Sequence, residues 1–116
     1  MSELEPVAAT RLTPLDKVER DGMVAVIVSP GFGAGWSTWS DDREAAVFAP
    51  DVVAWIEAGK PADAALLSEW QERYGYLGGL RDVEIEWVPK GARFVIDEFD
   101  GSESLTILGP DHGYVA

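Results

Sequence analysis

MVAVIVSPGFGAGWSTW, residues 23–39, is the stretch that decides the fold of this chain. Its first six residues are apolar and mostly β-branched, with no alternation between apolar and polar positions. An uninterrupted run of this kind is typical of a strand that is covered on both faces. Ser29 and Pro30 end the run, because proline has no N–H to donate to a sheet. We therefore expect a central strand at residues 23–28, followed by a loop rich in glycine and tryptophan.

Two helices are expected between Pro50 and Tyr74. Pro50 is favourable as a first helical residue, and Gly59 ends the first predicted helix. The second predicted helix covers residues 62–74, where apolar residues recur at helical spacing. Residues 43–48 fit either a short strand or the start of a helix.

The last third of the chain predicts an antiparallel meander. Residues 83–87 alternate between apolar and acidic side chains, and residues 92–97 return after a turn. Asp100 and Gly101 signal a hairpin before a strand at residues 104–108, and residues 114–115 add a short edge. The predicted fold class is α+β: a mainly antiparallel sheet, made of the central N-terminal strand and the C-terminal meander, with two helices on one face.

The length of 116 residues predicts one domain. We expect a flexible N-terminal lead-in at residues 1–13 and a single α+β domain at residues 14–116. No apolar run is long enough to cross a bilayer, and the start of the chain lacks the pattern of a signal peptide. The chain has no cysteine, which excludes disulfides, a thiolate zinc site and a cysteine nucleophile, and which fits a reducing cytoplasm.

The charge of the chain is unusual. Nine Lys and Arg residues stand against 21 Asp and Glu residues, which gives a formal net charge of −12. Nucleic acids and anionic membranes should repel such a chain, because phosphate binding needs clustered cations. The composition suits a partner with a basic surface, or a protein that imitates a polyanion.

The loop after the central strand is the first candidate site. Its alternating glycines let a ligand approach the main chain, and its exposed amides can form a nest for an anion. Trp36 and Trp39 offer stacking surfaces, and Ser37 and Thr38 offer hydroxyls for phosphate or ribose oxygens. Neither the G-x-G-x-x-G spacing nor the Gly-Lys-Ser/Thr ending of a phosphate-binding loop is present. The alternative is a tight structural loop whose tryptophans cover the edge of the core.

Three further groups of residues are candidate sites. Arg81 follows a Gly-Gly pair and suits a phosphate, or else pairs with a neighbouring carboxylate such as Asp82. His112, the only histidine, has no G-x-S-x-G serine to serve, so that hydrolysis is not expected. The third group consists of carboxylates, several of which could share one face if their strands pair as a meander. That face would be a phosphate-like row, a Mg²⁺ or Ca²⁺ site, or only a solvated surface. The group comprises Glu84, Glu86, Asp97, Glu98, Asp100 and Glu103.

The runs VIVSPGFGAGWSTW, YGYLGGLRDVEIEWVPKG and ARFVIDEFDGSESL carry a resemblance to known proteins. Together they resemble a family of small uncharacterised proteins from phages and prophages. The resemblance implies a viral setting and no particular reaction. Short, acidic, cysteine-free phage proteins are similar in style to anti-defence proteins, some of which inhibit CRISPR complexes through acidic contacts while others sequester nucleotide immune signals.

The leading hypothesis is a non-enzymatic phage anti-defence protein that sequesters a small nucleotide-like immune signal in the host cytoplasm. It is expected to be a homo-oligomer without cofactor, metal or catalytic residues, and to bind neither nucleic acid nor membrane directly. The alternative is an acidic protein–protein inhibitor, a nucleic-acid mimic that occupies a basic channel of a host defence complex. A metal-dependent nuclease or phosphodiesterase is a third and weaker reading. The predicted ligand-binding residues are Gly31, Phe32, Gly33, Ala34, Gly35, Trp36, Ser37, Thr38, Trp39, Tyr76 and Arg81.

Overall fold

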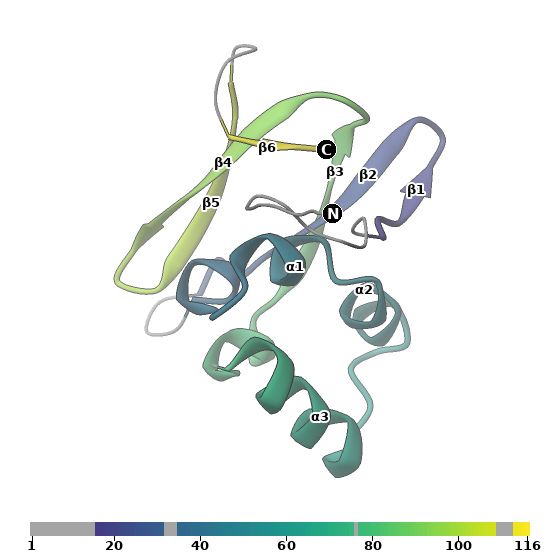
Figure 1. Cartoon of the computed structure of the whole chain (residues 1–116), viewed down its shortest axis with the longest axis vertical. Coiled ribbons are helices and arrows are strands. Elements are labelled where there is room, and N and C mark those ends of the chain that lie inside the picture. The colour runs from purple at the N-terminus through teal and green to yellow at the C-terminus, as the bar shows by residue number, and fades with distance from the viewer. Residues whose placement is uncertain (1–15, 32–34, 76, 109–112) are drawn as a thin grey trace, which may run out of the picture.

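A computed structural model describes residues 16–31, 35–75, 77–108 and 113–116 of the chain (Figure 1). The expected lead-in at residues 1–13 lies outside these ranges. Strands and helices follow one another in the order β1 (Glu19–Arg20), β2 (Met23–Val28), η1 (Ser37–Trp39), α1 (Arg43–Phe48), α2 (Pro50–Glu57), α3 (Ala64–Tyr74), η2 (Gly78–Arg81), β3 (Glu84–Pro89), β4 (Arg93–Phe99), β5 (Ser102–Leu108) and β6 (Tyr114–Val115), where η marks a 3₁₀ helix.

The strands form two antiparallel sheets of three strands each, in the orders β1-β2-β3 and β5-β4-β6. The expected strand at residues 23–28 is confirmed with the same bounds, and it is the central strand of the first sheet. Met23 lies opposite Pro89 and Val28 lies opposite Glu84 in the β2–β3 ladder. Every residue of β2 after Met23 is buried, as a strand covered on both faces requires.

The two faces of β2 pack into two separate cores. Ala25 and Ile27 belong to a cluster with buried residues of α2 and α3, whereas the three valines of β2 face a second cluster that contains Phe94 of β4. Helices α2 and α3 therefore cover one face of the first sheet, and the second sheet covers the other (Figure 1). Helix α1 contributes to both clusters, Ala46 to the first and Phe48 to the second.

The expected α+β class, mostly sheet with helices, is confirmed. Residues 43–48, which fitted either a strand or a helix, form α1, and the Asp42 side chain caps it by accepting a hydrogen bond from the Ala45 amide. The strands of the predicted meander are divided between the sheets, since β3 pairs with β2 and β4 begins the second sheet. In the described ranges, no helix is both long enough and apolar enough to span a membrane.

Candidate functional site

The loop between β2 and α1 is built around the buried carboxylate of Glu103. Oε1 of Glu103 accepts a hydrogen bond from the Ser29 amide at 3.0 Å. Oε2 accepts bonds from the Trp36 amide at 2.7 Å, the Thr38 amide at 3.1 Å and the Thr38 hydroxyl at 2.6 Å. Glu103 is only 2 % exposed. Both carboxylate oxygens are therefore satisfied by the loop, as a buried charged group needs.

The start of β5 places Glu103 in this position. The Glu103 amide donates to the Ser29 carbonyl at 2.8 Å, and the Ser102 hydroxyl donates to the Pro30 carbonyl at 2.7 Å. These bonds hold the first residues of β5 against the end of β2. The Glu103 side chain shares the inward face of β5 with Leu105, so that it points at the loop instead of solvent.

Two glycines of the site serve close packing. A Cβ built on Gly35 would lie 2.8 Å from the Thr38 hydroxyl oxygen and 3.1 Å from Oε2 of Glu103. A Cβ on Gly79, in η2, would overlap the carbonyl oxygen of Gly35. The described part of this loop thus uses glycine to bring backbone against backbone, and the close approach expected for a ligand is taken up by the chain itself.

Trp36 is a core residue. Its ring has no exposed surface, and its Nε1 donates to the Ala46 carbonyl at 2.8 Å. The ring packs edge-on against Tyr74 with 5.3 Å between centroids. The expectation that Trp36 offers a stacking surface fails in this structure, because a ligand cannot reach a ring that the protein covers completely. Ser37 is also buried, whereas Trp39 is 38 % exposed.

The remaining predicted site residues do not gather at one cavity. Arg81 is exposed, and its carbonyl accepts a hydrogen bond from the Lys60 amine at 3.0 Å. Among the ion pairs that the described residues form, none joins Arg81 to Asp82. The Asp82 carboxylate instead lies against Gly31, where a Cβ would come within 2.5 Å of it. The other residues named above as candidates, Phe32, Gly33, Ala34, Tyr76 and His112, lie outside the described ranges.

Of the six candidate carboxylates, several of which were expected to share one face, two lie on the first sheet and four on the β4–β5 hairpin. Glu84 and Glu86 are exposed on β3, in the first sheet, and Asp97 and Asp100 are exposed at the β4–β5 hairpin. The inclusion of Glu103 in an acidic surface was wrong, because this residue is buried. No three or more acidic or histidine side chains are grouped as metal ligands in the part of the chain that is described.

Sequence reasoning missed Glu103 as the partner of the loop. The sequence did contain one indication of this role. Glu103 lies two and four residues before the apolar residues Leu105 and Ile107, so the three side chains are on the same face of the strand. Alternation therefore placed a carboxylate on the inward face of a strand. The partner of that carboxylate lies far away in sequence and follows only from the packing of β5 against the end of β2.

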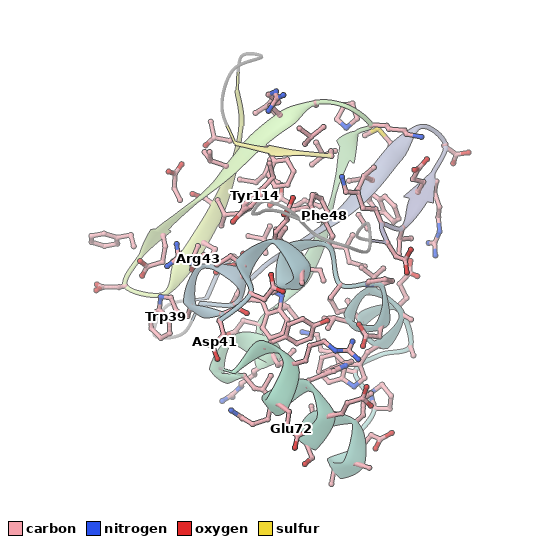
Figure 2. All side chains as sticks on the ribbon, viewed as in Figure 1. Trp39, Asp41, Arg43, Phe48, Glu72 and Tyr114 are labelled. Carbon is pink, nitrogen blue, oxygen red and sulfur yellow. The ribbon has the colours of Figure 1, made fainter. Side chains whose placement is uncertain are left out.

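Exposed aromatic and acidic side chains meet at the other surface of this region. Phe99, the last residue of β4, is 72 % exposed. Trp39 lies near the same end of the β4–β5 hairpin, because η1 packs against β4. The neighbouring Thr38 is also bonded to Glu103, which lies opposite Glu98 in the hairpin. Figure 2 shows Trp39 beside the tip of this hairpin. We call the set of Trp39, Asp97, Glu98, Phe99 and Asp100 the acidic–aromatic end.

The carboxylates of the acidic–aromatic end have no cationic partner within the described residues, since the ion pairs found there lie elsewhere. Asp97 accepts a bond from the Thr106 hydroxyl at 3.2 Å, and Glu98 accepts one from the Gly101 amide at 2.6 Å. These bonds orient the two side chains, and no ion pair among the described residues compensates their negative charge.

An open pocket of about 300 Å³ lies away from both regions, beside β1 and β2. Its wall includes Arg20 and Trp87, whose ring centroid is 5.3 Å from the guanidinium carbon. Arg20 already donates two hydrogen bonds to Glu57, at 2.5 and 2.7 Å, and this pairing lowers the pKa of the Glu57 carboxyl. We assign no ligand to this pocket.

Comparison of the chain with protein-family models, curated proteins and solved structures gave no match.

Proposed function

We propose that this chain is a non-enzymatic protein-binding module that docks on a basic surface of another protein through its acidic–aromatic end. One observation carries the proposal: Phe99, 72 % exposed at the tip of a hairpin, is flanked by the carboxylates of Glu98 and Asp100. Leaving a phenyl ring in water is unfavourable, and large exposed apolar side chains rimmed by polar groups mark interaction sites.

The two kinds of side chain have different tasks in such an interface. Phe99 and Trp39 supply apolar area that a partner can bury, and aromatic residues are enriched among the side chains that dominate binding energy. The carboxylates select a partner with Lys and Arg, and the net charge of −12 accelerates the encounter with it. A basic channel that normally holds nucleic acid fits both requirements.

The alternative in which the loop captures a nucleotide-like signal has less support. That hypothesis needs free amides near Trp36 and Thr38 and an accessible indole ring. The two amides already donate to Glu103, and the Trp36 ring is buried. Nucleotide capture stays a prediction, and the loop is best understood as the scaffold that presents Trp39.

The setting of the module is part of the proposal. We propose that the partner is a nucleic-acid-binding protein of a host defence complex, the setting that the resemblance to phage proteins implies. The proposed place of action is the cytoplasm of that host, which suits a chain without cysteine.

Selection from a random peptide library tests this proposal without knowledge of the natural partner. The chain is immobilised, and peptides of about 15 residues are enriched on it, a length that spans a typical binding face. We expect the enriched peptides to be rich in Arg and Lys. Their affinity should fall steeply as salt is raised from about 0.05 to about 0.5 M, because surface charges are then screened.

Variants locate the binding surface. Phe99→Ala is expected to weaken binding of a selected peptide about tenfold or more, as truncation of a central aromatic contact does. Ala54→Ser, on the exposed side of α2, is the matched control and should bind as the unaltered chain does. Selection of acidic or neutral peptides, or equal affinity for Phe99→Ala and the unaltered chain, contradicts the proposal.

A further inference from the structure

Strand β5 presents a free backbone edge. It pairs with β4 on one side, and in the described residues no strand lies on the other. The Glu103 amide points away from β4, because it donates to the Ser29 carbonyl. Successive backbone groups of a strand alternate in direction, so the N–H and C=O groups of Leu105 and Ile107 also point away from β4.

Bonds at the other side of β4 support this assignment. The Ala116 amide donates to the Ala92 carbonyl, and Phe94 lies opposite Tyr114 in the β4–β6 ladder. The backbone N–H and C=O groups of even-numbered residues in β4 and at Ala92 therefore point toward β6. Those of odd-numbered residues of β4 point toward β5. In the β4–β5 register, odd-numbered residues of β4 lie opposite even-numbered residues of β5. The backbone N–H and C=O groups of the odd-numbered residues of β5 therefore point away from β4.

Beyond Glu103, whose amide is bonded to Ser29, the described edge of β5 lacks the features that protect an edge strand. One outer strand of the first sheet, β3, carries exposed Glu84 and Glu86 and ends at Pro89, which are common devices against unwanted pairing. Residues 104–107 of β5 include neither a charged residue nor a proline. Ile107 is 52 % exposed. The β3 edge is thus guarded against pairing, whereas residues 104–107 of β5 are open to it.

We propose that β5 pairs with β5 of a second copy of this chain, antiparallel and about a two-fold axis at Thr106. Leu105 of each copy then lies opposite Ile107 of the other, and each such pair exchanges both of its N–H···O bonds. The exposed part of Ile107 becomes covered by Leu105 across the strands. The second sheets of the two copies, three strands each, join into one continuous sheet.

The charge of the chain favours a second copy at this edge over other surfaces. Two chains with a net charge of −12 repel each other wherever carboxylates meet. The strip at residues 104–107 brings no carboxylate of its own. The preceding Glu103 is buried, and the carboxylate of Asp97 accepts a hydrogen bond from the Thr106 hydroxyl. Antiparallel pairing also places the two acidic–aromatic ends at opposite ends of the joined sheet, where both stay accessible.

Sedimentation equilibrium of the full chain from about 5 to about 500 µM tests the dimer, since a short edge contact is expected to bind in the micromolar range. The unaltered chain should pass from monomer to dimer across this range. Ile107→Lys, which adds a charge of the kind that guards edges, should weaken self-association by about tenfold or more. Ala54→Lys adds the same charge on exposed α2 and should leave the dimer unchanged.

Amide hydrogen exchange supplies a second readout that does not depend on a variant. In the dimer the Leu105 and Ile107 amides should be protected, and this protection should disappear on dilution, whereas the Ser104 and Thr106 amides stay protected by β4. A chain that remains monomeric at the highest concentration overturns the proposal. A dimer with unprotected Leu105 and Ile107 amides, or one that Ile107→Lys does not weaken, overturns it as well. These outcomes are independent of peptide binding at Phe99.

Discussion

Glu103 shows how one residue can decide the role of a loop. Three backbone amides and one hydroxyl of the chain converge on its carboxylate. Amides that converge on one point in this way bind an anion, and here the anion belongs to the protein. The loop does form an anion-binding site, as its glycine pattern suggests, but the Glu103 carboxylate of the same chain occupies it.

Removal of the Glu103 side chain should therefore destabilise the fold strongly. We expect Glu103→Ala to lower the free energy of unfolding by about 3 kcal/mol or more, because several buried donors lose their acceptor at once. Urea denaturation measures this loss. Glu86→Ala, at an exposed position, is the control and should stay within about 0.5 kcal/mol of the unaltered chain. Equal stability of the two variants would show that the Glu103 carboxylate does not hold the loop.

The two tryptophans of the loop should respond in different ways. Trp36→Ala is expected to cost about 3–5 kcal/mol, because it leaves a cavity in the first core cluster. Trp39→Ala should cost less than about 1 kcal/mol, since much of that ring is already in water. Thermal unfolding of both variants checks this contrast. If Trp36→Ala is stable and well folded, the loop is again a candidate ligand-binding site.

At the scale of elements, Asp51 links helix α2 to helix α3. Its Oδ2 accepts a hydrogen bond from Nε1 of Trp70 at 2.8 Å and lies 3.1 Å from the Arg73 guanidinium. Trp70 is fully buried, so that its indole N–H needs this acceptor. The contact sets the position of α3 against the first sheet.

Asp51→Ala is expected to lower stability by about 1–3 kcal/mol, the cost of an unsatisfied buried donor. The measurement is the urea midpoint, read by tryptophan fluorescence because Trp70 reports its own environment. Glu72→Ala, at an exposed position of α3 (Figure 2), changes the same charge and should leave the midpoint almost unchanged. A similar midpoint for both variants would mean that packing alone holds the two helices together.

The elements differ in how far the sequence predicts them. Strand β2 was predictable because both of its faces are apolar, and the helix starting at Pro50 because proline and a following glycine mark its ends. Helix α1 was ambiguous, since Ala46 and Phe48 face different cores and leave no simple helical stripe. Strand β1 has two residues, both exposed, and no pattern marks it.

The candidate site was less predictable than the fold for a physical reason. Local patterns identified the loop and its donors, but the acceptor, Glu103, is 65 residues or more from the residues that it binds. Only the pairing of β5 with β4 and its contact with Ser29 bring it there. Exposure of Phe99 likewise depends on where the hairpin ends relative to the rest of the molecule.

At the scale of the whole molecule, stability should depend on pH in the alkaline range. Burial raises the pKa of the Tyr74 hydroxyl and of the Tyr114 hydroxyl above the ordinary value of 10.0. Both groups keep their protons more tightly in the folded chain than in the unfolded one. Their contribution to stability is therefore complete below pH 10 and is lost as the pH rises through the folded values.

Urea titrations at pH 8, 9, 10 and 11 check this expectation, and the midpoint should fall only in the last part of the series. Tyr74→Phe removes one of the two groups, so the fall should become shallower in that variant. A midpoint that rises above pH 10, or that falls equally steeply in Tyr74→Phe, contradicts the assignment of the effect to these buried hydroxyls.

The central claim is that the Gly/Trp loop is scaffold and that recognition happens at the acidic–aromatic end. The most direct test is an NMR titration of the isotope-labelled chain with a basic peptide from the selection and, separately, with a nucleotide. We expect the peptide to shift the resonances of the Phe99 and Asp100 amides and of the Trp39 indole N–H. The resonances of the Trp36 indole N–H and the Ser29 amide should stay in place, and the nucleotide should shift none of these signals. Nucleotide-induced shifts centred on the Trp36 indole and the Thr38 amide, with Phe99 unaffected by the peptide, would contradict the account.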